Sequence, residues 1–93
     1  MAPHDVPQDV QDGIAAAVSE TTSPEKWRVE AVYVPARGGY EFRIKYQGRS
    51  QPSSGRLVPD DVANVAPQPP LSGRGVLARD VVRDLLAWHS ASL

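Results

Sequence analysis

Apolar residues recur at every second position along two neighbouring stretches of the chain. The first covers residues 27 to 34, and one side of it carries Trp27, Val29, Ala31 and Tyr33. The second covers residues 40 to 47, and its matching side carries Tyr40, Phe42, Ile44 and Tyr46. Because successive side chains of a strand point to opposite faces, the pattern predicts two strands that share one apolar face. Pro35-Ala36-Arg37-Gly38-Gly39 interrupts the alternation and predicts a hairpin loop.

Two registers of this hairpin keep the apolar residues on one face. A four-residue loop over residues 36 to 39 places Glu30 opposite Lys45, whereas a six-residue loop places Glu30 opposite Arg43. Each register pairs opposite charges, which contributes at most about 1 kcal/mol. We favour the four-residue loop, in which a glycine takes the left-handed conformation that such hairpins need.

A weaker third strand is predicted over residues 51 to 58. Gln47-Gly48-Arg49-Ser50 has the composition of a turn, and the chain then runs back to Leu57-Val58. Pro52 cannot donate a hydrogen bond to a sheet, so we place this strand at an edge.

Helical spacing marks the N-terminal segment. The recurrence of Val10, Ile14, Ala17, Val18 and Thr21 at helical spacing predicts an amphipathic helix over residues 6 to 21, with Asp9, Asp12 and Glu20 left for solvent. Gly13 weakens this helix by about 1 kcal/mol relative to Ala. Ser23-Pro24-Glu25-Lys26-Trp27 then predicts one short helical turn capped by Ser23.

A second amphipathic helix is predicted over residues 76 to 90. Its apolar stripe consists of Leu77, Ala78, Val81, Val82, Leu85, Ala87 and Trp88. Residues 59 to 75, rich in Pro and Gly, form a long connection to it, and Asp60 caps one predicted helical turn over residues 60 to 65. Connections of this length are usually functional or mobile.

Together these elements predict one small α+β domain over residues 1 to 93, of which residues 1 to 5 form a flexible terminus. A three-stranded antiparallel meander makes one layer, and the N- and C-terminal helices pack on its apolar face as the second. Two helices are too few to cover both faces of the sheet. The opposite face is therefore expected to be open.

Composition narrows the functional class. A chain of 93 residues suits a single core and leaves little room for a deep, walled active site. The absence of Cys excludes a disulfide framework, a thiol nucleophile and a cysteine zinc site, and it suits a reducing compartment. Neither a signal-peptide start nor a membrane-length apolar run is present. We expect a cytoplasmic protein with no membrane partner, and the excess of Arg over Lys suits a bacterial GC-rich genome.

Charge is distributed unevenly. Residues 26 to 58 hold seven of the ten basic residues and only two acids, a local net charge of +5, while the flanks carry a net charge of −6. Uneven charge of this kind bears on partners and not on catalysis.

No residue pattern predicts catalysis. The two histidines, His4 and His89, lack a second His or a carboxylate at ligand spacing, and we expect each to be exposed or at a helix end. Asp60-Asp61 lacks the further oxygen ligands of a calcium loop. None of the common phosphate-binding, zinc-protease or serine-hydrolase motifs is present, and Gly73-Arg74-Gly75 is too short for a phosphate loop. We therefore expect a protein that is not an enzyme and has no metal or cofactor.

The basic segment leaves nucleic-acid binding as an alternative. A base-stacking sheet needs aromatic and basic side chains on the same face. Here the aromatic residues share the apolar face, while Arg28, Arg43 and Lys45 lie on the other. With a sequence pI near 6.0, this arrangement favours a protein partner over a nucleic acid.

The order of elements resembles the YezG-type immunity proteins of bacterial polymorphic-toxin systems. In that family a helix leads into a Pro-x-x-Trp-like step, here Pro24-Glu25-Lys26-Trp27, and then into a strand and a Tyr-containing partner strand, here residues 40 to 46. The resemblance covers residues 10 to 58. The Pro-rich connection and the neutral last helix depart from the family pattern. The resemblance implies a non-enzymatic protein that neutralises a cognate toxin, and it transfers no binding residue.

The leading hypothesis is a small protein-binding module. We expect its open sheet face to meet another protein, such as a toxin domain, or a second copy of the chain in a homodimer. The predicted partner-binding residues are Arg28, Glu30, Val32, Val34, Arg43, Lys45 and Gln47.

Overall fold

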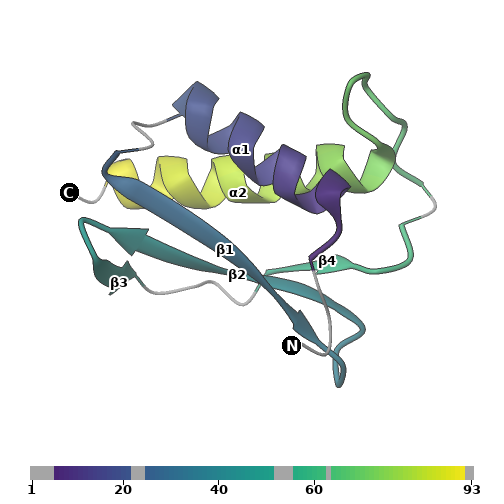
Figure 1. Cartoon of the computed structure of the whole chain (residues 1–93), viewed down its shortest axis with the longest axis horizontal. Coiled ribbons are helices and arrows are strands. Elements are labelled where there is room, and N and C mark those ends of the chain that lie inside the picture. Colours follow the sequence, from purple (N-terminus) through teal and green to yellow (C-terminus); the bar gives the residue numbers. More distant parts are fainter. Residues whose placement is uncertain (1–5, 22–24, 52–55, 63, 92–93) are drawn as a thin grey trace.

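Two helices lie on one face of an antiparallel sheet in the computed structural model of the chain (Figure 1). The structure describes residues 6–21, 25–51, 56–62 and 64–91. In chain order the elements are α1 (Gln8–Thr21), β1 (Trp27–Val34), β2 (Gly39–Tyr46), β3 (Arg49–Gln51), β4 (Leu57–Pro59) and α2 (Gly73–Ala91). This two-layer arrangement confirms the predicted α+β fold. Ser23 and Pro24 of the predicted short turn lie outside the described residues, and Glu25 and Lys26 form a turn before Trp27.

The preferred hairpin register was wrong. β1 pairs with β2 so that Glu30 faces Arg43, and the pairing continues as far as Val34 and Gly39. Residues 35–38 make the loop, and Gly38 takes the left-handed conformation there with a φ of 67°. Gly39 instead lies in the strand, where a Cβ atom would overlap the backbone of β4. The close approach of β4 therefore explains why the loop comes one residue earlier than expected.

The third strand exists as two short pieces that share one edge of β2. β3 pairs with the end of β2 near Tyr46, and β4 pairs with its beginning near Gly39. Gln47 and Gly48 alone make the turn before β3, with φ angles of 50° and 80°, so the expectation that Arg49 and Ser50 belong to the turn was wrong. Pro52 lies outside the described residues.

α2 begins three residues before the predicted start. The side-chain oxygen of Ser72 accepts a hydrogen bond from the backbone N–H of Gly75 (3.1 Å), as an N-cap residue does. The helix therefore incorporates Gly73, Arg74 and Gly75, which the sequence pattern placed in the connection. The helical turn expected at Asp60 was also wrong, because Asp60 and Asp61 form a bend.

α1 and α2 pack closely where two glycines meet. A Cβ atom at Gly13 would overlap the carbonyl oxygen of Gly75 and lie 3.1 Å from the Cβ of Ala78. A Cβ atom at Gly75 would in turn lie 2.8 Å from the carbonyl oxygen of Asp9. Gly13, which lowers helix propensity, is thus needed for the close approach of the two helices.

The core lies between the helix pair and the sheet. Its largest fully buried side chains are Phe42, Ile44, Leu86, Val10, Val58 and Val82. The buried face of α2 differs from the predicted stripe: Leu86 is fully buried, Ala87 is exposed and Trp88 is 60% exposed. His89 lies in the last turn of α2, at a helix end as expected, and is buried beside Trp27. Near the end of α2, the last two residues that the predicted stripe assigned to the core are therefore exposed, and Leu86 and His89 beside them are buried.

We expect Gly13→Ala to lower the free energy of unfolding by about 2 kcal/mol, because the added methyl group forces the helices apart. This loss outweighs the gain of about 1 kcal/mol in helix propensity. Urea denaturation followed by circular dichroism measures the change. Ser19→Ala is the matched control, since Ser19 is exposed on the same helix and should gain up to about 0.5 kcal/mol. A Gly13→Ala variant as stable as the parent protein would contradict the packing described.

Candidate protein-binding face

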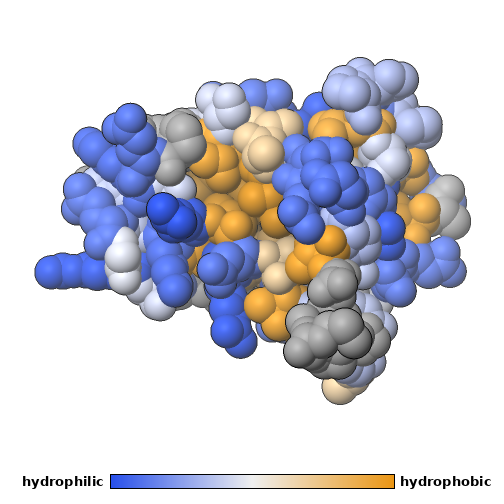
Figure 2. Space-filling view, in the orientation of Figure 1, coloured by the Kyte–Doolittle hydropathy of each residue, from blue (hydrophilic) through white to orange (hydrophobic). Residues whose placement is uncertain are grey.

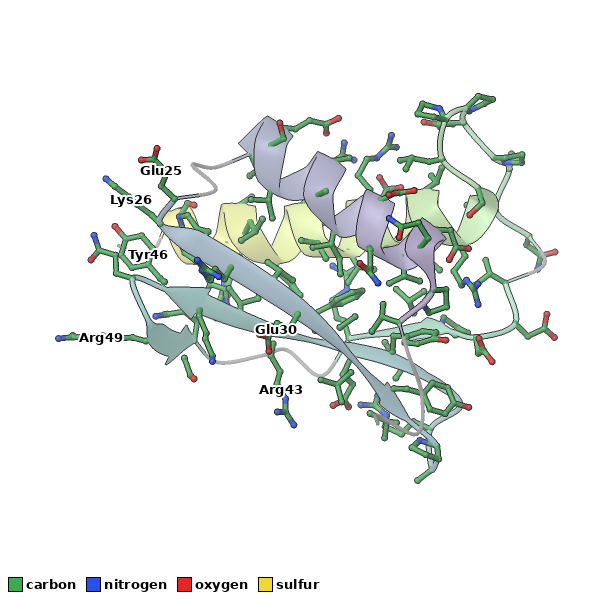
Figure 3. All side chains as sticks on the ribbon, in the orientation of Figure 1. Glu25, Lys26, Glu30, Arg43, Tyr46 and Arg49 are labelled. Carbon is green, nitrogen blue, oxygen red and sulfur yellow. The ribbon has the colours of Figure 1, made fainter. Side chains whose placement is uncertain are left out.

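The structure brings six of the seven predicted partner-binding residues together on the sheet face opposite the helices. They are Arg28, Glu30, Val32 and Val34 of β1 and Arg43 and Lys45 of β2. Glu30 and Arg43 project from this side of the sheet in Figure 3. Gln47, the seventh, lies in the turn after β2 with a positive φ, and is not part of the strand. We call the six residues the open face.

The hairpin register sets the charge pattern of the open face. Glu30 faces Arg43, which is a favourable cross-strand pair. Arg28 faces Lys45, so two cations stand directly opposite each other. Like charges at facing positions are destabilising. The register with a four-residue loop, which the sequence favoured, would have placed Glu30 opposite Lys45. In that register Arg28 and Lys45 would not face each other.

The cations of the open face have no carboxylate bound to them within the described residues. Arg28, Arg43 and Lys45 make no ion pair there, and neither does Glu30. By contrast, Arg37 and Glu41 at the loop end of the hairpin do form an ion pair. The part of the face that lies away from the loop therefore carries three cations and one carboxylate, Glu30, and is basic.

The loop end of the open face carries two valines, and Glu41 faces Val32 there. Val32 and Val34 are half-buried, not exposed as the alternation pattern suggested. A hollow of about 380 Å³ lies at the other end of the face. Its lining residues are Glu30, Arg43, Ile44, Lys45, Ser50 and Gln51. The face thus combines a small apolar area, a charged area and a shallow hollow.

The aromatic residues lie on the helix side of the sheet, as the alternation predicted. Trp27, Tyr40 and Phe42 are buried, and Tyr33 and Tyr46 are half-buried. Trp27 packs on Tyr46 with 4.5 Å between ring centroids. No aromatic ring of these strands is placed on the open face beside the cations.

A second charged cluster joins both helices to the sheet through Arg74. Its guanidinium donates from Nε to Asp9 Oδ2 (2.9 Å) and from Nη2 to Asp9 Oδ1 (3.1 Å). A further bond runs from Nη1 to Asp60 Oδ1 (2.9 Å), and the guanidinium lies 6.0 Å from the ring centroid of Tyr40. Ser72 also donates to Asp9 (3.0 Å). Arg74 therefore holds the N-terminal ends of both helices against the sheet.

Burial and these contacts shift three pKa values in the cluster, and the hydrogen bonds to Asp9 raise that of Arg74. Burial alone would raise the pKa of Asp9, but the hydrogen bonds from Arg74 and Ser72 and the charge of Arg74 hold it below its ordinary value. Burial, together with the nearby carboxylate of Asp60, raises the pKa of Tyr40. Ionised Asp9 and neutral Tyr40 are both satisfied by their neighbours, which indicates a structural role for the cluster.

Sequence reasoning missed this cluster. It left Asp9 for solvent and treated Asp60 as a helix cap, and it gave Arg74 no role. Asp9 and Arg74 are far apart in the chain, and no spacing rule connects them. The acidic start of one helix and the lone arginine at the start of the other were the only signals available.

The described residues show no constellation suited to metal binding, since no three His, Asp or Glu side chains gather at one point. His89 is buried with its Nε2 atom unpaired among the described residues, between the rings of Trp27 and Trp88. It therefore has the environment of a core residue at a helix end.

No protein-family model matches the chain, and neither a curated protein nor a solved structure matches it. The resemblance to YezG-type immunity proteins stays a prediction. Within the described part of the chain, neither helix is long and apolar enough to cross a membrane.

The lowered pKa of Asp9 leads to a prediction about pH. A carboxyl group whose pKa is lower in the folded state stabilises the fold above its unfolded pKa, near 3.9, and loses that contribution as the pH falls further. We expect Asp9→Asn to lower the free energy of unfolding by about 1 kcal/mol at pH 7. The difference from the parent protein should shrink below about pH 4.

Urea denaturation at a series of pH values measures this difference. Asp12→Asn is the control, because Asp12 is exposed on the same helix and its side chain accepts a hydrogen bond from Gln8 alone within the described residues. It should change stability by less than about 0.5 kcal/mol. A destabilisation by Asp9→Asn that stayed constant down to pH 2 would contradict the role of the ionised carboxylate.

Proposed function

We propose that the protein is a non-enzymatic binding module whose open face binds an acidic surface of another protein. The observation that carries this proposal is that Arg28 faces Lys45 and that neither of them forms an ion pair within the described residues. An acidic side chain of a partner placed between these cations would replace a repulsion with two attractions. Rim charges of this kind direct association and specificity.

The surroundings of these cations favour a protein over a nucleic acid. Val32 and Val34 continue the same face with apolar surface, which protein interfaces use and phosphate backbones do not. The aromatic rings that would stack on bases are on the helix side of the sheet. The whole chain carries a net charge of −1, unlike a typical nucleic-acid binder.

The resemblance of residues 10 to 58 to YezG-type proteins supports a narrower form of the proposal. In that form the partner is a toxin domain, and binding blocks the acidic surface that the toxin presents. The module then acts in the bacterial cytoplasm, where the toxin would otherwise be active. A toxin-like reading frame beside the gene identifies the candidate partner.

Charge reversal on the open face tests the proposal. We expect Arg43→Glu combined with Lys45→Glu to abolish capture of the neighbour-encoded partner by the immobilised protein. The free energy of unfolding should change by no more than about 1 kcal/mol, as for most surface substitutions. Biolayer interferometry measures capture, and urea denaturation measures stability.

The matched control is Arg56→Glu combined with Arg83→Glu, which changes the net charge by the same amount. Both residues are exposed and lie off the open face. Capture should persist in this control. Equal loss of capture in both double variants would contradict a role for the open face. Retardation of single- or double-stranded DNA at low salt, lost in the open-face variant, would instead assign the surface to nucleic acid.

A further inference from the structure

The two edges of the sheet differ in how well they are protected from pairing. One edge consists of the short strands β3 and β4, and β4 ends in Pro59. The other edge is β1, which has eight residues and no proline, and which pairs only with β2 in the described part of the chain. Short strands and proline are common protections against edge pairing, and a long, regular edge is open to it. We propose that β1 pairs antiparallel with β1 of a second copy, so that two sheets join across a two-fold axis.

The backbone hydrogen bonds indicate which residues of β1 can make this contact. The carbonyl oxygen of Lys26 accepts a hydrogen bond from the N–H of Gln47 (2.8 Å), just beyond the ends of the two strands. Backbone groups alternate in direction along a strand, so the even-numbered residues of β1 direct theirs toward β2. The odd-numbered residues, among them Trp27, Val29 and Ala31, direct theirs toward the free edge. These residues must form the hydrogen-bonded pairs of any added strand.

The charges on β1 favour one register among those that the backbone allows. When the two-fold axis passes through Val29, Arg28 of each copy faces Glu30 of the other. An axis through Glu30 places the two Glu30 carboxylates opposite each other. An axis through Arg28 places the two Arg28 side chains opposite each other. An axis through Ala31 leaves both charges opposite valines. Only the register centred on Val29 pairs opposite charges, and it does so twice.

This register also gives Arg28 the anionic neighbour that its own chain does not provide among the described residues. Across the joined sheet, each row then runs Lys45, Arg28, the second copy's Glu30 and the second copy's Arg43. Three cations accompany one carboxylate in each row. The open face of the dimer therefore stays basic, and dimerisation is compatible with the binding of an acidic partner.

The side of β1 that faces the helices also suits a second copy. A groove of about 350 Å³ runs between α1 and β1, and it is lined by Val6, Gln11, Ile14, Ala15, Val29, Glu30 and Ala31. Figure 2 shows an apolar band where α1 passes over β1, with hydrophilic surface on either side. A two-fold axis perpendicular to the sheet places both grooves on the same side. Their apolar rims then meet, and the small side chains of Ala15 and Ala31 permit close approach.

A charge-swap cycle on the purified full chain tests the proposal without any other partner. Sedimentation velocity over a range of concentrations gives the dimer dissociation constant. Glu30→Arg places arginine opposite arginine, and Arg28→Glu places glutamate opposite glutamate, so we expect each to weaken the dimer at least about tenfold. The double variant Arg28→Glu with Glu30→Arg restores both ion pairs and should dimerise within about threefold of the parent protein.

Each other outcome overturns the proposal. A parent protein that stays monomeric up to about 1 mM has no such interface. A double variant as weak as either single variant excludes the register centred on Val29. If the dimer persists in the Arg28 and Glu30 variants but is lost when Arg43→Glu is combined with Lys45→Glu, the dimer forms through the open face and not through the edge of β1. Because only the purified chain is used, these results are independent of whether the proposed acidic partner exists.

Val29→Pro provides a second variant with a different readout. It removes an N–H group that faces the free edge, while the hydrogen bonds from β1 to β2 come from the even-numbered residues. We expect an unchanged far-ultraviolet circular dichroism spectrum and no detectable dimer. A folded Val29→Pro variant that still dimerises like the parent protein would contradict pairing through β1. The charge-swap cycle decides the matter alone if this variant does not fold.

Discussion

The register between β1 and β2 is the constraint on which the rest of this structure depends. Two requirements determine it: the apolar side chains of both strands must face the helices, and Gly39 must lie where β4 passes too close for a side chain. Once the register is set, the same pairing that buries Phe42 and Ile44 places Arg28 opposite Lys45 on the other face. Core packing thus produces a cationic surface that the described residues do not neutralise. The proposed binding site follows from the requirements of the hydrophobic core.

Two sets of contacts hold the helices in this arrangement. Gly13 and Gly75 allow the backbones of α1 and α2 to come close, and Arg74 binds Asp9 on one side and Asp60 on the other. With the helix pair on one face, the opposite face of the sheet carries no helix in the described structure (Figure 1). The helix pair covers one face of the sheet, and within the described part of the chain β2 is the only strand that pairs with β1. A module of this size therefore offers two distinct surfaces, a basic open face and a free strand edge.

Much of the fold could be predicted from the sequence because it depends on local periodicity. Alternation from Trp27 to Tyr46 identified both long strands and sorted their side chains between the two faces. The register could not be predicted, since both candidates kept the apolar face intact and paired Glu30 with a cation. The difference lay in the contact between Gly39 and β4, which is distant in sequence. The same limit applies to the cluster around Arg74, whose partners come from separate elements. Six of the seven predicted binding residues share the open face. Gln47 does not, because it lies in the turn between β2 and β3, where its φ is positive.

The most direct test of this account is a measurement of the hairpin register in solution. In an antiparallel pair, α-protons lie closest at the positions that are not hydrogen-bonded to each other. The pairing of β1 with β2 predicts strong nuclear Overhauser effects between the α-protons of Val29 and Ile44 and between those of Ala31 and Phe42. Strong effects between Val29 and Tyr46 and between Ala31 and Ile44 would show a register shifted by two residues. Arg28 would then no longer face Lys45, and the account of the open face would be contradicted.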